Sequence, residues 1–137
     1  HVPQQTAVGA NDALDAPYDE WSSKRLADHL VQSEIVSAYR LLATAGEPEM
    51  PVFPFYHGDQ WSAMVPSGAP AAELGAAFSG IRSYVSRTLR NLPEGSYPRE
   101  CQTRRRKPLS ELVVDVVEHA GRHIEELGRR LRLELRP

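Results

Sequence analysis

Two histidines near the end of the chain, His119 and His123, are four residues apart in a segment with helical periodicity. At this spacing both side chains leave the same face of an α-helix, one turn apart, and we expect both to face the core. Neutral imidazoles placed in this way converge on one divalent ion at about 2.0 to 2.1 Å, as in helical zinc motifs. The spacing alone is not sufficient, because such a pair also occurs as one hydrogen-bonded core residue and one edge residue.

A third histidine, His29, lies in the first turns of an earlier helical segment, at one border of its apolar arc. Packing of the two helices would bring it to the other pair. Three histidines leave part of the coordination shell to water or substrate, which is typical of catalytic metal sites. Such an ion lowers the pKa of a bound water or thiol, or polarises a carbonyl. We therefore predict a divalent-metal site formed by His29, His119 and His123.

A zinc protease of the HExxH type is excluded, because Ala120 stands where the general base of that motif would be. The sequence offers no rival nucleophile beside a base. The predicted chemistry therefore depends on the metal ion.

Three long helical stretches must position these histidines. They run from Ser22 to Ala45, from Pro70 to Leu92 and from Pro108 to Leu131, each with an apolar stripe at spacings of three and four residues. Proline and glycine restrict any earlier helix to a short or truncated one, over about residues 4–14. No segment of the sequence shows the alternation of apolar and polar residues that is typical of a β-strand. We predict an all-α four-helix bundle in which residues 1–137 form a single domain.

The link between the second and third helices, residues 47–69, sets the order of the bundle. Its four prolines leave neither a helical period nor a paired strand. We expect an ordered aromatic crossover that carries the chain back along the bundle and gives an up-down-down-up order. His57 and Asp59 lie in this link, either as solvated residues or as part of a loop over a pocket.

Other polar residues have simpler interpretations than catalysis. Glu34 lies within an apolar arc and is expected to pair with Arg82 rather than approach the metal. Cys101 is interpreted as a passive half-buried residue rather than a ligand or reactive thiol. We interpret the basic run at residues 104–107 as a solvated loop. The alternative is that it binds the carboxylates of a small thiol cofactor.

Composition excludes several classes of partner. With 16 Lys and Arg against 18 Asp and Glu, the formal net charge is −2, so we expect no nucleic-acid partner. No apolar run approaches the roughly 20 residues that cross a bilayer, and no secretory signal is recognisable, so we expect no membrane partner. One cysteine cannot form an internal disulfide, which suits a cytoplasmic location.

Several of these features occur together in a known family. The residues concerned are Trp21, Ser22, His29, Leu30, His119 and His123. In this arrangement, from about Asp19 to Arg130, they resemble the DinB family of metal-binding four-helix bundles. In that family, a histidine of the second helix and an HxxxH motif of the fourth supply three metal ligands. The resemblance therefore implies the same three ligands here, with zinc or nickel as the ion.

The resemblance also implies a homodimer that acts on a small-molecule substrate. Some members and relatives use mycothiol, bacillithiol or glutathione in S-transfer or isomerisation, which implies a metal-dependent S-transferase or isomerase whose ion activates the thiol. Two alternatives stay open: a non-catalytic, dimerising metal-binding protein related to stress, and a bundle whose histidines are core residues without a metal.

Two departures from the family pattern concern the beginning of the chain. The first helix is short or truncated, or a partner chain completes it. Arg25 stands where a glutamate would close a capping box with Ser22, so we expect a weaker start to the second helix.

Overall fold

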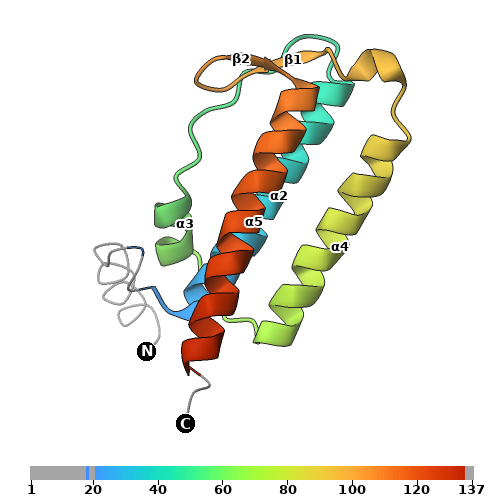
Figure 1. Ribbon diagram of the computed structural model, residues 1–137. Coiled ribbons are helices and arrows are strands. Elements are labelled where there is room, and N and C mark those ends of the chain that lie inside the picture. Colours follow the sequence, from blue (N-terminus) through green and yellow to red (C-terminus); the bar gives the residue numbers. More distant parts are fainter. Residues whose placement is uncertain (1–17, 19–20, 135–137) are drawn as a thin grey trace.

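Three long helices dominate the computed structural model, which describes Tyr18 and residues 21–134 (Figure 1). They are α2 (Ser23–Gly46), α4 (Ala71–Arg90) and α5 (Leu109–Glu134). The connections contain the short helix α3 (Gly58–Met64), the 3-10 turn η2 (Glu94–Ser96) and the strands β1 (Glu100–Gln102) and β2 (Arg106–Pro108). The short helix expected over residues 4–14 lies outside the described residues.

Helix α2 is the central element of this arrangement. It packs against α4, α5 and α3. It runs in the same direction as α4 and opposite to α5, as Figure 1 shows. The all-α prediction is confirmed, and these three helices have the down-down-up order expected after a first helix. None of the helices described is long and apolar enough to cross a membrane.

The start of α2 is capped despite the missing glutamate. Ser22 Oγ accepts a hydrogen bond from the Arg25 backbone N–H at 3.1 Å, which satisfies one free amide of the first turn. The Arg25 guanidinium lies 3.6 Å from the centroid of the Trp21 ring and donates to Ser62 Oγ of α3 at 3.0 Å. The departure at position 25 therefore supplies a contact between α2 and α3.

The main hydrophobic core lies at the end of the bundle where the β1–β2 hairpin joins α5. Its buried members come from α2, α4, α5, β1 and the crossover: Leu41, Ala43, Phe53, Val85, Cys101, Leu109 and Leu112. Cys101 and Leu109 are fully buried. Cys101 is thus more buried than expected and lies outside the histidine cluster. This core fixes the end of α2 against the beginning of α5.

The prediction of an irregular crossover is wrong in one part. Residues 58–64 form α3 because the four prolines of the link all lie outside this stretch, and its Ser62 and Ala63 are buried. Strand pairing was also missed. Cys101 pairs with Lys107 in an antiparallel hairpin, and Val52 bridges to Gln102. Strands of three residues are too short to show alternation in the sequence.

The apolar stripe predicted for α5 is only partly buried. Leu109, Leu112 and Ala120 are buried, but Val117 and Ile124 are 54% and 47% exposed. Among the described elements, α5 packs mainly against α2 and β2, so it buries a narrow face. Periodicity reports the width of an apolar stripe but not how much of it a neighbour covers.

An ion pair joins α2 to α4, as the sequence predicts. Arg82 Nε and Nη2 donate to the two oxygens of Glu34 at 2.6 and 2.8 Å. The Glu34 side chain is 5% exposed and that of Arg82 is 28% exposed. The hydrogen bonds that Arg82 donates to the Glu34 carboxylate raise the pKa of Arg82. The carboxylate of Glu34 is therefore engaged by Arg82, in the structural role that the sequence predicts.

Removal of the Glu34 charge tests this role. Glu34→Gln leaves a half-buried guanidinium with one neutral partner, so we expect the free energy of unfolding to fall by about 1–3 kcal/mol. The matched control is Glu100→Gln, which breaks the exposed pair with Arg106 and should cost less than about 1 kcal/mol. Urea denaturation measures the free energy of unfolding of both variants. Equal decreases would contradict a special role for Glu34.

Candidate metal centre

The packing of α2 against α5 brings the three predicted histidines together. One ligand atom each from His29, His119 and His123 lie within 4.8 Å of one another. Nε2 of His119 is 3.1 Å from Nε2 of His123. Two nitrogens that bind one tetrahedral ion at 2.0 to 2.1 Å are about 3.3 Å apart. The α5 pair therefore stands close to the spacing of two ligands on a common ion.

His29 is the buried member of the group, at 6% exposure. The Trp21 ring meets it edge-on at a centroid distance of 5.5 Å, and the Tyr56 ring is parallel to it at 6.5 Å. Its Nε2 lies 3.5 Å from Ser33 Oγ, whereas its Nδ1 is buried without a hydrogen-bond partner. A buried polar atom without a partner costs about 1–3 kcal/mol. A metal bond would satisfy this nitrogen, so the donor set fits a divalent ion.

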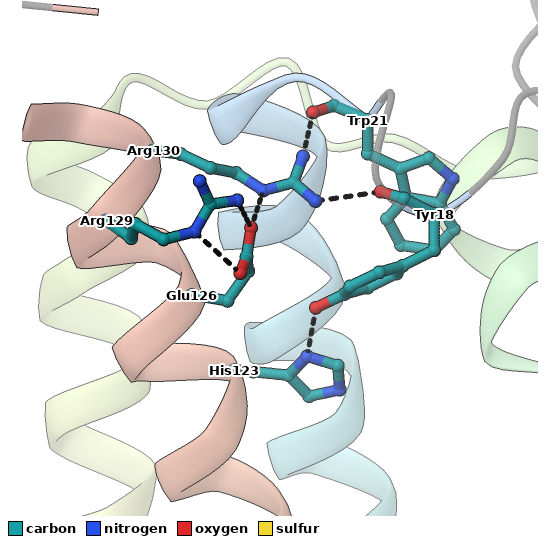
Figure 2. A network of polar contacts seen from close by, with 6 residues as sticks. All are labelled: Tyr18, Trp21, His123, Glu126, Arg129 and Arg130. Carbon is teal, nitrogen blue, oxygen red and sulfur yellow. Dashed lines mark hydrogen bonds and ion pairs between the residues drawn. The ribbon is translucent and has the colours of Figure 1, made fainter. Parts of the chain in front are cut away.

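Tyr18 orients His123. The Tyr18 hydroxyl is 2.7 Å from Nδ1 of His123. Figure 2 draws this contact as a dashed line. In the tautomer that a ligand requires, Nδ1–H donates to the Tyr18 oxygen and the lone pair of Nε2 faces His119. Hydrogen bonds of this kind fix the ring orientation of metal-binding histidines.

A network of arginines on α5 holds Tyr18 in place (Figure 2). Arg130 is 7% exposed, and its guanidinium donates to the backbone oxygens of Tyr18, at 2.8 Å, and of Trp21. Glu126 accepts from Arg130 Nε at 2.6 Å and also pairs with Arg129. Hydrogen bonds from Arg129 and Arg130 lower the pKa of Glu126 to about 2. This network ties the segment before α2 to α5, within two turns of His123.

The histidines face an open cavity of about 530 Å³ rather than the core. It is lined by Tyr18, His29, Phe55, Tyr56, His57, Gly58, Asp59, Gln60, His119 and His123. His119 is exposed and His123 is half-buried, so the expectation that both rings face the core is wrong. The crossover and the start of α3 pass beside the rings and build a wall that helical periodicity cannot predict. His57 and Asp59 both contribute to this wall.

The environment keeps the imidazoles neutral. Burial lowers the pKa of His29, and the nearby His119 lowers it further. Burial, followed by Arg122, lowers the pKa of His119. The pKa of His123 falls to about 4, first through burial and then through the charges of His119 and His29. Unprotonated imidazole is the form that binds a metal ion.

Comparison with known proteins agrees with this geometry. The family model of the DinB superfamily matches residues 10–127. The chain belongs to the DinB superfamily. No curated protein matches the sequence of this DinB-superfamily chain.

A solved structure similar to this DinB-superfamily chain is YfiT from Bacillus subtilis, described as "a probable metal-dependent hydrolase with an unusual four-helix bundle topology". The two align with a TM-score of 0.69 and 23% identity, over 93% of this chain and 78% of that chain. The similarity confirms the four-helix bundle fold.

Three residues of this DinB-superfamily site were not predicted from sequence: Tyr18, Tyr56 and Gly58. A side chain at Gly58 would place Cβ 2.7 Å from Cε1 of His29 and 3.2 Å from the Tyr56 ring. Only a glycine fits here without displacing these rings. The sequence carries no signal for this contact, because it joins residues that are 29 positions apart and come from two different elements.

The lowered histidine pKa values predict how stability depends on pH. Because an ordinary unfolded-state histidine has a pKa of about 6.5, the unfolded chain binds more protons than the folded chain below this value. The free energy of unfolding should therefore be constant above about pH 6.5 and fall as the pH drops towards 4. Chemical denaturation of metal-free protein measures this. His123→Gln should reduce the slope, and parallel curves for the two proteins would contradict the assignment.

Gly58→Ala tests whether the crossover positions His29. The added methyl must displace the His29 ring, so we expect metal affinity to fall about 10- to 100-fold, the range seen when groups that orient a ligand are changed. Competition with a chromogenic chelator measures this. Gly80→Ala is the control, because its Cβ would meet nothing within 4 Å, and it should leave affinity unchanged. A Gly58→Ala protein with wild-type affinity would contradict the positioning role.

Proposed function

We propose that this protein binds a divalent metal ion through His29, His119 and His123 and activates a nucleophile in the adjoining cavity. The observation that carries the proposal is the meeting of three neutral imidazoles at the wall of an open cavity of about 530 Å³. Imidazole donors suit zinc and nickel. A site that only stored an ion would need no such opening, which favours an enzyme over the non-catalytic alternative.

The chain's own groups in the cavity serve to position and to move protons. Among the described residues of the lining there is no serine, threonine or cysteine, and we infer that the nucleophile comes from solution. When bound, a divalent ion lowers the pKa of a thiol or water and so supplies the nucleophile at neutral pH. Asp59 and His57 on the cavity wall offer acid-base groups, and Phe55 and Tyr56 offer apolar surface.

We infer that the nucleophile is the thiol of a small cofactor, such as mycothiol, bacillithiol or glutathione, and that the reaction is S-transfer or isomerisation. The inference is supported by the resemblance of this site to thiol-dependent members of the DinB superfamily. Activation of water is the second candidate, because YfiT is described as a probable metal-dependent hydrolase. Both reactions require the same three ligands and differ in what enters the cavity.

Metal analysis of protein purified without a nickel column tests the ligand set. We expect about one divalent ion per chain and a loss of at least about tenfold in occupancy for His119→Ala, because two imidazoles hold an ion much less tightly than three. His57→Ala, which removes an exposed histidine from the same cavity, is the matched control and should retain the ion. An unchanged metal content in His119→Ala would overturn the assignment.

Turnover assays distinguish the candidate reactions. A panel of mycothiol, bacillithiol and glutathione with an aromatic halide electrophile should give metal-dependent thioether formation that His119→Ala abolishes. Metal-dependent cleavage of esters or amides without any thiol would instead favour hydrolysis. A protein that binds the ion tightly but supports neither reaction would favour the non-catalytic alternative.

A further inference from the structure

A second cavity, of about 850 Å³, lies between α2, α5 and the β1–β2 hairpin. Its basic lining residues are Arg40, Arg104, Arg105, Lys107 and Arg122, and its acidic ones are Asp115 and Glu118. The chain as a whole carries a net charge of −2. Positive charge is therefore concentrated locally in this cavity, and a concave wall focuses its field.

Three of these cations, Arg40, Arg104 and Arg122, have no carboxylate partner within the described part of the chain, and Arg40 donates instead to the backbone oxygen of Pro54 at 2.7 Å. Arg105 pairs with Glu111, and Lys107 Nζ is 2.7 Å from Asp115. No such ion pair involves Arg104 or Arg122 among the residues described. The cavity thus presents two guanidinium groups to an external anion.

The second cavity continues into the histidine cavity. Phe55, Tyr56 and His119 line both. Phe55 is 62% exposed, and the guanidinium of Arg104 lies 5.8 Å from its ring centroid. One small molecule can therefore contact the histidine cluster at one end and the arginines at the other, with its middle against an apolar ring.

We propose that Arg104 and Arg122 form a subsite for an oxyanionic group, a carboxylate or a phosphate, of the molecule whose reactive end lies at His29, His119 and His123. Guanidinium groups bind such oxyanions through paired, charge-assisted hydrogen bonds. The position of the reactive end rests on the proposed function, whereas binding of the anion does not. The arginines select substrates that carry a negative charge distant from the reacting atom.

Titration of small anions, followed by ¹⁵N–¹H NMR, tests the subsite directly. Succinate, inorganic phosphate and neutral succinamide are the probes. We expect saturable shifts of the amides around Arg104 and Arg122 with succinate, phosphate or both, and none with succinamide. Whichever of the two anions binds more tightly identifies the group recognised, a carboxylate or a phosphate. Equal responses to succinamide and to the anions would overturn the proposal.

Charge-removing variants separate the subsite from general attraction. Arg104→Gln and Arg122→Gln should each raise the dissociation constant of the preferred anion about tenfold, the effect of losing one charge-assisted hydrogen-bonded contact. Arg87→Gln is the matched control, since it removes one exposed arginine of α4 that is outside both cavities. An equal loss of anion affinity in Arg87→Gln would show that the effect comes from net charge alone, and would refute the subsite.

Metal-free wild-type protein distinguishes failure of this proposal from failure of the proposed function. Anion binding there should still weaken about tenfold on Arg122→Gln, even if no reaction is ever found. In the loaded protein, Arg122→Gln should raise KM for glutathione about tenfold but leave KM for 2-mercaptoethanol, which has no carboxylate, unchanged. Equal changes for both thiols, with equal metal content in both proteins, would refute the link between the cavities.

Discussion

The antiparallel packing of α2 against α5 is the constraint on which the site depends. At one end the buried Leu109 and Cys101 fix α5 against the end of α2. At the other end Arg130 holds the backbone oxygens of Tyr18 and Trp21. The three histidines lie between these two attachments, so their spacing is set by contacts that they do not make themselves. Preorganisation of this kind makes three imidazoles converge without help from an ion.

Electrostatics and burial act in the same direction at the cluster. Burial lowers the pKa values of all three histidines and favours the neutral, ligating form. Neighbouring histidines lower those of His29 and His123 further, and Arg122 lowers that of His119. The same features make the metal-free cluster costly, since His29 Nδ1 is buried without a hydrogen-bond partner. The site is therefore coupled to folding: a bound cation would stabilise the chain by mass action, and acid would destabilise it.

The connections decide what surrounds the histidine cluster. The crossover and α3 place Phe55, His57 and Asp59 beside the histidines, and the hairpin adds Arg104 to the adjoining cavity. The helices alone would leave the histidine cluster on an open surface of the bundle. The irregular segments convert it into two connected cavities, one next to the imidazoles and one next to the arginines, in keeping with the tendency of loops on a rigid scaffold to carry specificity.

Local patterns in the sequence were enough to predict the long helices, the all-α class, the Glu34–Arg82 pair and the grouping of the three histidines. These features follow from local periodicity or from side chains that need a partner of fixed chemistry. The fold and the family were thus predictable. Three features are visible only in the folded chain: His119 faces a cavity, residues 58–64 form a helix, and Tyr18 and Gly58 shape the site. Those features join segments far apart in the chain, and the packing that joins them has no period or spacing that a linear pattern could reveal.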